Sequence, residues 1–171
     1  MITALFGASC TGKTTIARAL AVELKLPLRS CGDAVRSRAR DLSIPWFNLP
    51  DEQHRAVDEE TRTWCASTQP CIVEGRFLDS VLVPLQDDTV LIQLLASKAT
   101  RCARWASRAG GPCRPEEIDA HDEADRRFRM RMYDSREIFL PALVINTSRG
   151  SIRACAQRVK FLLKTGGEQR A

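Results

Sequence analysis

The stretch that decides the fold of this chain is Gly7-Ala8-Ser9-Cys10-Thr11-Gly12-Lys13-Thr14, close to the amino terminus. It matches the phosphate-binding motif GxxxxGK(S/T) at every fixed position. Such a loop wraps a pyrophosphate with its amides pointing inward, so glycine stands where φ must be positive or where a side chain would collide. The motif therefore predicts that this segment, with the adjoining Thr15, binds the phosphates of a nucleotide.

Two side chains at the end of the motif have roles that follow from their chemistry. The Lys13 ammonium is a point charge for the β- and γ-phosphates, and the Thr14 hydroxyl is a hard oxygen ligand for Mg²⁺. The helix that begins here aims its positive end at the bound anion. We therefore expect ATP and Mg²⁺ as cofactors, with Lys13 acting in catalysis and Thr14 holding the metal.

The segments around the loop predict alternating strands and helices. Ile2 to Phe6 is a short apolar run typical of a buried strand, and Thr14 to Leu26 has apolar residues at helical spacing. Further strands are expected at 28–30, 71–73, 89–95 and 142–145, and further helices at 32–42, 51–67, 98–109, 115–136 and 151–164, with a frayed tail from 165. Strands that alternate with helices indicate a parallel sheet covered on both faces. The sequence predicts one α/β domain over residues 1–171 with the three-layer P-loop NTPase fold.

The composition is that of an ordinary globular domain. The 171 residues are 44% hydrophobic and 27% charged, and no apolar run approaches the roughly 20 residues that cross a bilayer. There is no basic segment before the first apolar run, so we expect a cytoplasmic protein without a membrane partner. The number of cysteines, seven, is odd, and no two of them form a CxxC pair. The chain has only two histidines that could add zinc ligands. Both observations favour free thiols over disulfides or a zinc site.

Arginine accounts for the net charge of +5. The arginines gather in three groups, at 29–40, at 101–108 and at 126–131. A guanidinium fork suits bidentate contact with phosphate, so a small phosphate-rich ligand explains these groups as well as nucleic acid would. No basic patch with interleaved aromatic residues is present, and we expect no nucleic-acid partner. Several of these arginines are expected to be solvated charges on helix faces.

The order of motifs along the chain resembles that of the nucleoside monophosphate kinases, and most closely the short cytidylate kinase-like branch. The matching segments are GASCTGKTT (7–15), SCGDAVRSRARDLS (30–43), IVEGR (72–76), RCARWASRAGG (101–111), and DEADRRFRMRMYD (122–134) followed by LVINTS (143–148). The resemblance implies transfer of the γ-phosphoryl group of ATP to a nucleoside monophosphate, with CMP or dCMP as the first candidates. It also implies a small arginine-rich lid at about 98–114 and an acceptor-binding region at about 31–67.

The resemblance assigns the acceptor phosphate to Arg36 and Arg76. Glu74 directly follows a strand-like run, and we expect it to hold a metal-bound water at the carboxyl edge of the sheet. Arg104 and Arg108 lie four residues apart, on one helix face, where they would close over the transferring group.

Three further expectations concern residues around this centre. Arg127 would reach toward the substrate from the next helix, and Asp33 would either touch the acceptor or cap a helix. By analogy with the family, the adenine is expected near Asn146 to Arg149. Arg101 shares the face of Arg104 and Arg108, and three like charges there predict a segment that is mobile until an anion is bound.

Some features depart from the family pattern and leave alternatives open. Tyr133 is followed by Asp134-Ser135-Arg136 in place of a Tyr-Gly-Ile-Asp turn, and Gly-Gly-Pro-Cys-Arg at 110–114 resembles an insertion. These departures, with the unusual loop SIPWFNLP at 43–50, keep open a P-loop kinase that phosphorylates a hydroxyl of a small metabolite or antibiotic. A nucleotide-binding protein without turnover is a third hypothesis. In each case we expect a monomer or weak homodimer whose partner is a small molecule.

Overall fold

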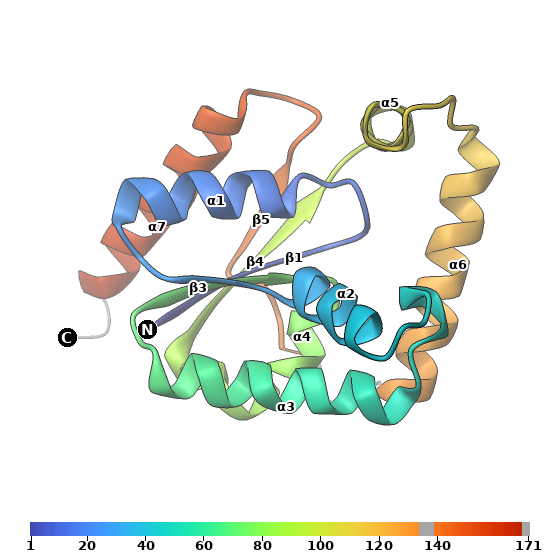
Figure 1. Cartoon of the computed structure of the whole chain (residues 1–171). Helices are drawn as coiled ribbons and strands as arrows, with labels where there is room; N and C mark the ends of the chain where they lie inside the picture. Colours follow the sequence, from blue (N-terminus) through green and yellow to red (C-terminus); the bar gives the residue numbers. More distant parts are fainter. Residues whose placement is uncertain (134–138, 169–171) are drawn as a thin grey trace.

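The computed structural model describes residues 1–133 and 139–168 and contains one parallel sheet (Figure 1). Its five strands lie in the order β2-β3-β1-β4-β5. The strands are β1 (Ile2–Phe6), β2 (Leu28–Ser30), β3 (Cys71–Gly75), β4 (Thr89–Leu95) and β5 (Leu143–Asn146). Since β1 is central and all pairs are parallel, the phosphate loop that follows it lies at the middle of the carboxyl edge.

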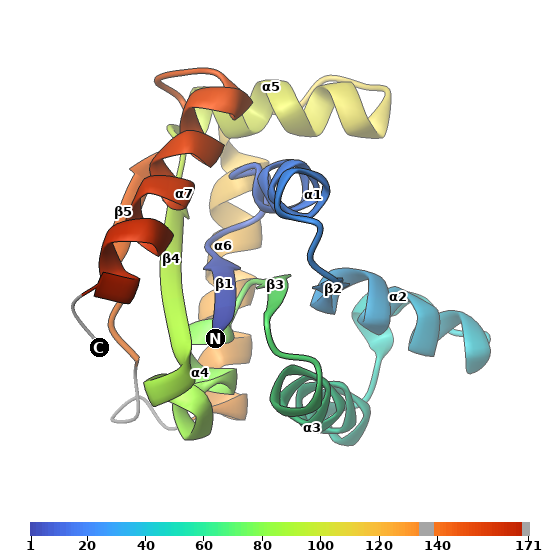
Figure 2. The ribbon, with the colours of Figure 1, turned by 90° about the vertical axis from the view of Figure 1, so that its left-hand side faces the viewer.

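Helices cover both faces of this sheet, and Figure 1 shows α1 and α7 on one side with α3 and α4 on the other. Figure 2 shows α5 lying across one end of the sheet beside α1. The helices are α1 (Lys13–Leu24), α2 (Cys31–Asp41), α3 (Asp51–Ser67), α4 (Leu78–Val81), α5 (Lys98–Ala109), α6 (Pro115–Met132) and α7 (Ile152–Glu168). This arrangement confirms the predicted three-layer α/β fold.

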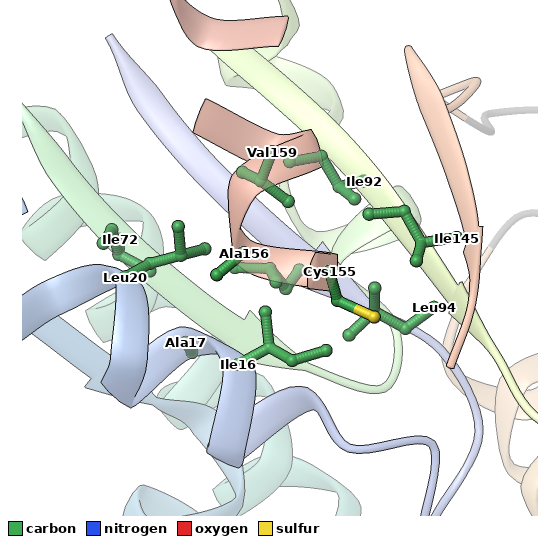
Figure 3. Close-up of a cluster of buried hydrophobic side chains, with 11 residues drawn as sticks. Ile16, Ala17, Leu20, Ile72, Ile92, Leu94, Ile145, Cys155, Ala156 and Val159 are labelled. Carbon is green, nitrogen blue, oxygen red and sulfur yellow. The ribbon is translucent and has the colours of Figure 1, made fainter. Parts of the chain in front are cut away.

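Alternation along the strands divides the core in two. In β1, Leu5 packs toward α1 and α7, whereas Ala4 and Phe6 pack toward α3 and α4. The first of these clusters joins Leu20 of α1 and Val159 of α7 to the strands (Figure 3). Both faces of the central strands are buried, which explains why their sequences read as continuous apolar runs.

The predicted boundaries differ from the structure mainly at helix ends. The helix expected to end near 136 ends at Met132, and the remainder of that expected range falls in 134–138, outside the described residues. The tail expected to fray from 165 continues α7 to Glu168, and 169–171 lie outside the described residues. The sequence analysis missed α4, because four residues are too few to show a helical period. Among the described helices, none is long and apolar enough to cross a membrane.

The core predicts a sharp contrast between two residues of α1. Leu20 is fully buried between the sheet and α7, whereas Val22 is 81% exposed. We expect Leu20→Ala to lower the free energy of unfolding by about 3 kcal/mol, because it removes buried methyl groups and leaves a cavity. Val22→Ala should change it by less than about 0.5 kcal/mol. Urea denaturation of the two variants measures both values, and equal losses would contradict the packing described here.

Candidate active site

The phosphate loop between β1 and α1 contains three residues with positive φ. They are Gly7 at 142°, Cys10 at 64° and Gly12 at 93°. A Cβ on Gly7 would lie 2.2 Å from the carbonyl oxygen of Leu94 in β4. The structural demand for glycine at position 7 therefore comes from the close approach of β4 as well as from φ.

The Lys13 side chain lies back against its own loop. Its ammonium donates a hydrogen bond to the carbonyl oxygen of Ala8 at 2.8 Å. Burial lowers the pKa of Lys13 to about 8, and the nearby Glu74 carboxylate opposes part of that shift. A desolvated ammonium at this place is well suited to bind phosphate oxygens, because it gains an anionic partner in a low-dielectric site.

Thr14 and Glu74, the two expected metal ligands, are in contact. The Thr14 hydroxyl donates to Glu74 Oε1 at 3.0 Å, and the Ser30 hydroxyl donates to the same oxygen. Glu74 is 3% exposed, at the carboxyl end of β3. A hydroxyl beside a carboxylate fits Mg²⁺, which accepts hard oxygen ligands and keeps several waters. Within 1–133 and 139–168 no cluster of three or more acidic, histidine or cysteine side chains could hold a metal alone, so the phosphates would have to complete the coordination.

The arginine face of α5 contacts the phosphate loop directly. Arg101 Nε donates to the carbonyl oxygen of Ser9 at 2.8 Å, and Arg104 Nη1 donates to that of Cys10 at 3.1 Å. Arg108 Nη2 lies 2.8 Å from Cys10 Sγ. All three guanidinium groups therefore converge on two consecutive residues of the loop.

Two of these arginines have further partners within the protein. The sequence analysis expected the three charges to repel one another and so to make the segment mobile, and these partners change that expectation. Arg101 is 7% exposed and makes a bidentate ion pair with Asp122 of α6. Arg104 Nη2 donates to the carbonyl oxygen of Thr147 at 2.8 Å. The charge of Arg101 is thus compensated inside the protein, and the argument for a mobile segment applies to Arg108 and the residues after it.

The two arginines assigned to the acceptor phosphate lie on different elements. Arg76 directly follows β3, and its guanidinium pairs with Asp125 of α6. Arg36 of α2 pairs with Asp33 at 2.6 Å. The predicted helix cap at Asp33 is wrong, because Ser30 caps α2 and its side chain accepts the hydrogen bond from the Asp33 amide.

One cavity of about 830 Å³ joins most of the predicted site residues. The residues that line it include Lys13, Thr14, Glu74, Arg76, Arg36 and Arg108. Arg104 and Thr147 also line it. Asp33 lines a separate groove, and Arg127 lies outside this lining, 70% exposed and 3.7 Å from Glu123.

The sequence analysis missed four polar residues that complete the site. Asp122 and Asp125 hold Arg101 and Arg76 from α6. Their spacing of three residues places them on one helix face, but the sequence alone does not show which face meets α5. Asp58 and Tyr133 line the cavity, and the Tyr133 hydroxyl donates to Asp58 Oδ2 at 2.8 Å. Asp58 stands in the charged run Asp58-Glu59-Glu60, where nothing distinguishes it from solvated neighbours.

The comparisons with known proteins agree with this geometry. No protein-family model matches the sequence. A cytidylate kinase from Pyrobaculum arsenaticum is 31% identical over 157 residues, covering 86% of this chain and 84% of that protein. A cytidylate kinase from Pyrobaculum aerophilum is 30% identical over 161 residues, covering 89% and 86%.

Solved structures share the fold at lower identity. A gluconokinase from Sinorhizobium meliloti superposes with a TM-score of 0.66 at 14% identity, covering 99% of this chain and 97% of that one. A shikimate kinase from Acinetobacter baumannii in complex with shikimate gives 0.65 at 18% identity, covering 96% and 93%. At these identities the likeness concerns the fold alone.

The three-layer sheet, the complete phosphate loop and the arginines around it define a P-loop kinase, an ATP-dependent phosphotransferase. Within that class, the chain belongs to the cytidylate kinase family, as its identity to the Pyrobaculum proteins over most of its length shows.

The position of Lys13 predicts a large loss of activity on truncation. Lys13→Ala removes the charge that we expect to bind the β- and γ-phosphates, and kcat/KM should fall on the order of 10²–10³-fold or more. Lys164→Ala, an exposed lysine of α7, serves as the matched control and should keep full activity. Turnover of ATP by purified variants measures this. A folded Lys13→Ala protein with full turnover would contradict the assignment.

Proposed function

We propose that this protein transfers the γ-phosphoryl group of ATP to the phosphate of a nucleoside monophosphate, with CMP and dCMP as the foremost acceptors. The observation that carries the proposal is one cavity that Arg36 and Arg76 line together with the phosphate-loop residues Lys13 and Thr14. An acceptor phosphate brings about two negative charges beside those of ATP, and two guanidinium groups suit that load. The Pyrobaculum relatives, which are named cytidylate kinases, support the choice of acceptor.

The chemistry asks mainly for positioning and for positive charge. Phosphoryl transfer passes through a loose transition state with negative charge on the equatorial oxygens. Lys13 and Arg108 line the cavity and would stabilise that charge. An acceptor phosphate is already ionised near neutral pH, since its second pKa is about 6, so its oxygen attacks without a general base. Mg²⁺, held by Thr14 and through water by Glu74, would neutralise the β- and γ-phosphates.

We assign the moving part of the site to the end of α5 and the segment after it. Residues 98–114 form the proposed lid and 31–67 the proposed acceptor region. Because Arg101 and Arg104 already contact the loop carbonyls, the first two turns of α5 would stay in place. Gly110 has φ of 72° and open space around it, which suits a hinge for the movement of Arg108 and its successors. The adenine would lie near Thr147 and Gly150, which line the cavity.

One observation favours a second candidate, a kinase that phosphorylates a hydroxyl. A hydroxyl acceptor must lose its proton, and a carboxyl group with a raised pKa is a suitable base. Burial raises the pKa of Asp58, which lines the cavity, to about 6. The solved structures of similar fold include a gluconokinase and a shikimate kinase, and their names suggest gluconate and shikimate as hydroxyl acceptors to test.

Formation of ADP from ATP distinguishes the candidates. The acceptors to compare are CMP, dCMP, UMP, AMP and GMP on one side and shikimate and gluconate on the other, with Lys13→Ala as background. The proposal expects turnover with a nucleoside monophosphate and background rates with the hydroxyl compounds. Turnover restricted to a hydroxyl acceptor would overturn it in favour of the second candidate. ATP binding without turnover of any acceptor would leave a nucleotide-binding protein.

The assignment of Arg76 predicts a split between the two substrates. Arg76→Ala should raise the KM for CMP by roughly 10- to 100-fold, since a charge-assisted pair to the acceptor phosphate is lost. The KM for ATP should change by less than about threefold. Arg158→Ala, an exposed arginine of α7, is the control. Because the variant also leaves Asp125 without its partner, thermal melting must show that it is folded. An increase confined to the KM for ATP would refute the assignment.

A further inference from the structure

The cavity has an aromatic lining next to Arg76 that the phosphate chemistry does not use. The Phe77 and Phe128 rings are stacked, with centroids 5.4 Å apart and planes inclined by 22°. Tyr133 lies against both, at 5.7 Å from Phe77 and 6.4 Å from Phe128. All three rings line the cavity. Aromatic side chains contact flat heterocycles in a way that tolerates any base, so this lining supplies affinity and no selection between bases.

Asp58 is the acidic group that lines the cavity next to these rings. It projects from α3, and Tyr133, just past the end of α6, donates a hydrogen bond to its Oδ2 atom. Figure 1 shows that the end of α6 lies beside α3. Burial, the largest influence, raises the pKa of Asp58 to about 6, and the Tyr133 hydrogen bond works against that rise. At neutral pH the group is therefore mostly ionised, although its partial burial disfavours the charged form.

Besides the Tyr133 hydrogen bond, the positive charges of Arg62 and Arg55 act on this carboxylate and lower its pKa. None of the ion pairs within residues 1–133 and 139–168 includes Asp58. Arg62, one turn further along α3, instead pairs with Glu59 and contacts the carbonyl oxygen of Val81. A half-buried carboxylate that lines a cavity and has one neutral hydrogen-bond donor is a candidate for ligand recognition.

The chemistry of a carboxylate decides which base it accepts. A carboxylate only accepts hydrogen bonds, and the Tyr133 hydroxyl already serves its Oδ2 atom. The Oδ1 atom can therefore accept from an N–H group of a bound base. Cytosine carries an exocyclic amine at C4, where uracil carries a carbonyl oxygen. A carbonyl oxygen held against a carboxylate leaves both acceptors desolvated and unpaired, which is strongly unfavourable.

We propose that Asp58, oriented by the Tyr133 hydroxyl, selects the acceptor base by accepting a hydrogen bond from its exocyclic amine. Cytosine is then accepted and uracil rejected, while the aromatic cluster of Phe77, Phe128 and Tyr133 forms the wall of the cavity beside the base. This inference rests on the proposed function, because it assumes a nucleoside monophosphate acceptor. In this account Asp58 is a specificity-determining residue, and Tyr133 is a positioning residue that acts through it.

The test compares kcat/KM for CMP and UMP in the wild-type protein and in Asp58→Asn. The wild type should prefer CMP on the order of 100-fold, since its site leaves a carboxylate unpaired with UMP. An amide can donate to the uracil carbonyl as well as accept from the cytosine amine. In Asp58→Asn the preference should therefore fall at least about tenfold, partly through a rise in kcat/KM for UMP. The KM for ATP should stay within about threefold of the wild-type value.

Two further variants keep the test decisive. Glu59→Gln changes the next residue of α3, an exposed side chain paired with Arg62, and should leave the CMP preference unchanged. Tyr133→Phe keeps the ring and removes the hydroxyl, and should reduce the preference severalfold without affecting the KM for ATP. If Asp58→Asn does not fold, the result with Tyr133→Phe decides.

The outcomes separate this inference from the proposed function. If the wild type phosphorylates CMP and Asp58→Asn keeps its preference over UMP within about threefold, the inference is overturned and the function stands. If Asp58→Asn loses turnover of every acceptor with the acceptor KM unchanged, Asp58 is a catalytic base and the inference is also overturned. If the wild type phosphorylates no nucleoside monophosphate, the proposed function itself fails.

Discussion

The carbonyl groups of the phosphate loop impose the constraint on which the rest of the site depends. A loop that offers its amides to an anion must find donors for its carbonyl oxygens elsewhere, because buried backbone groups are costly when unpaired. Here four consecutive carbonyls accept hydrogen bonds from side chains. The pairs are Lys13 and Thr11 to Ala8, Arg101 to Ser9, Arg104 to Cys10, and Thr147 to Thr11.

This requirement explains why distant segments meet at the loop. Arg101 and Arg104 come from α5, and Thr147 follows β5. Asp122 in turn binds the Arg101 guanidinium and thereby connects α6 to the same loop. The side chains that the sequence analysis assigned to the transferring group thus also stabilise the loop itself. Arg108 differs from the other two arginines of this helix face. Among the described residues, its guanidinium contacts the Cys10 sulfur and no backbone carbonyl of the loop.

Much of the fold could be predicted from the sequence because its signals are local. The motif between Gly7 and Thr14 requires a strand before it and a helix after it, and the apolar runs of β1 and β4 end at the residues that were predicted. The end of α6 was predicted less well because no glycine or proline marks it. The end of α7 was misplaced because the helix continues through Gly166 and Gly167, a residue type that usually ends a helix. The cap of α2 was misplaced for a different reason: Ser30 and Asp33 both suit that position, and the strand boundary decides between them.

The acceptor end of the site could be predicted only in part. Arg36 and Arg76 were recognised through motifs, and both line the cavity. Asp58 and Tyr133 meet across 75 positions of sequence, and a pairing at that distance has no local signal. Asp58 directly follows Val57, which is buried, but this position in α3 does not by itself indicate a site. Asp58 becomes part of the site because the end of α6 packs against α3 and brings Tyr133 to it.

The central claim is that ATP and the acceptor nucleotide occupy one cavity, with their phosphates meeting between Lys13 and Arg76. Isothermal titration with a two-substrate analogue, adenosine and cytidine joined by five phosphates, tests this most directly. The account predicts one site per chain and an affinity at least about 100-fold tighter than that of CMP alone, because the linked second nucleotide binds intramolecularly. Both ATP and CMP should compete with it. An analogue that binds no more tightly than ATP, while CMP still binds to the occupied protein, would contradict the claim.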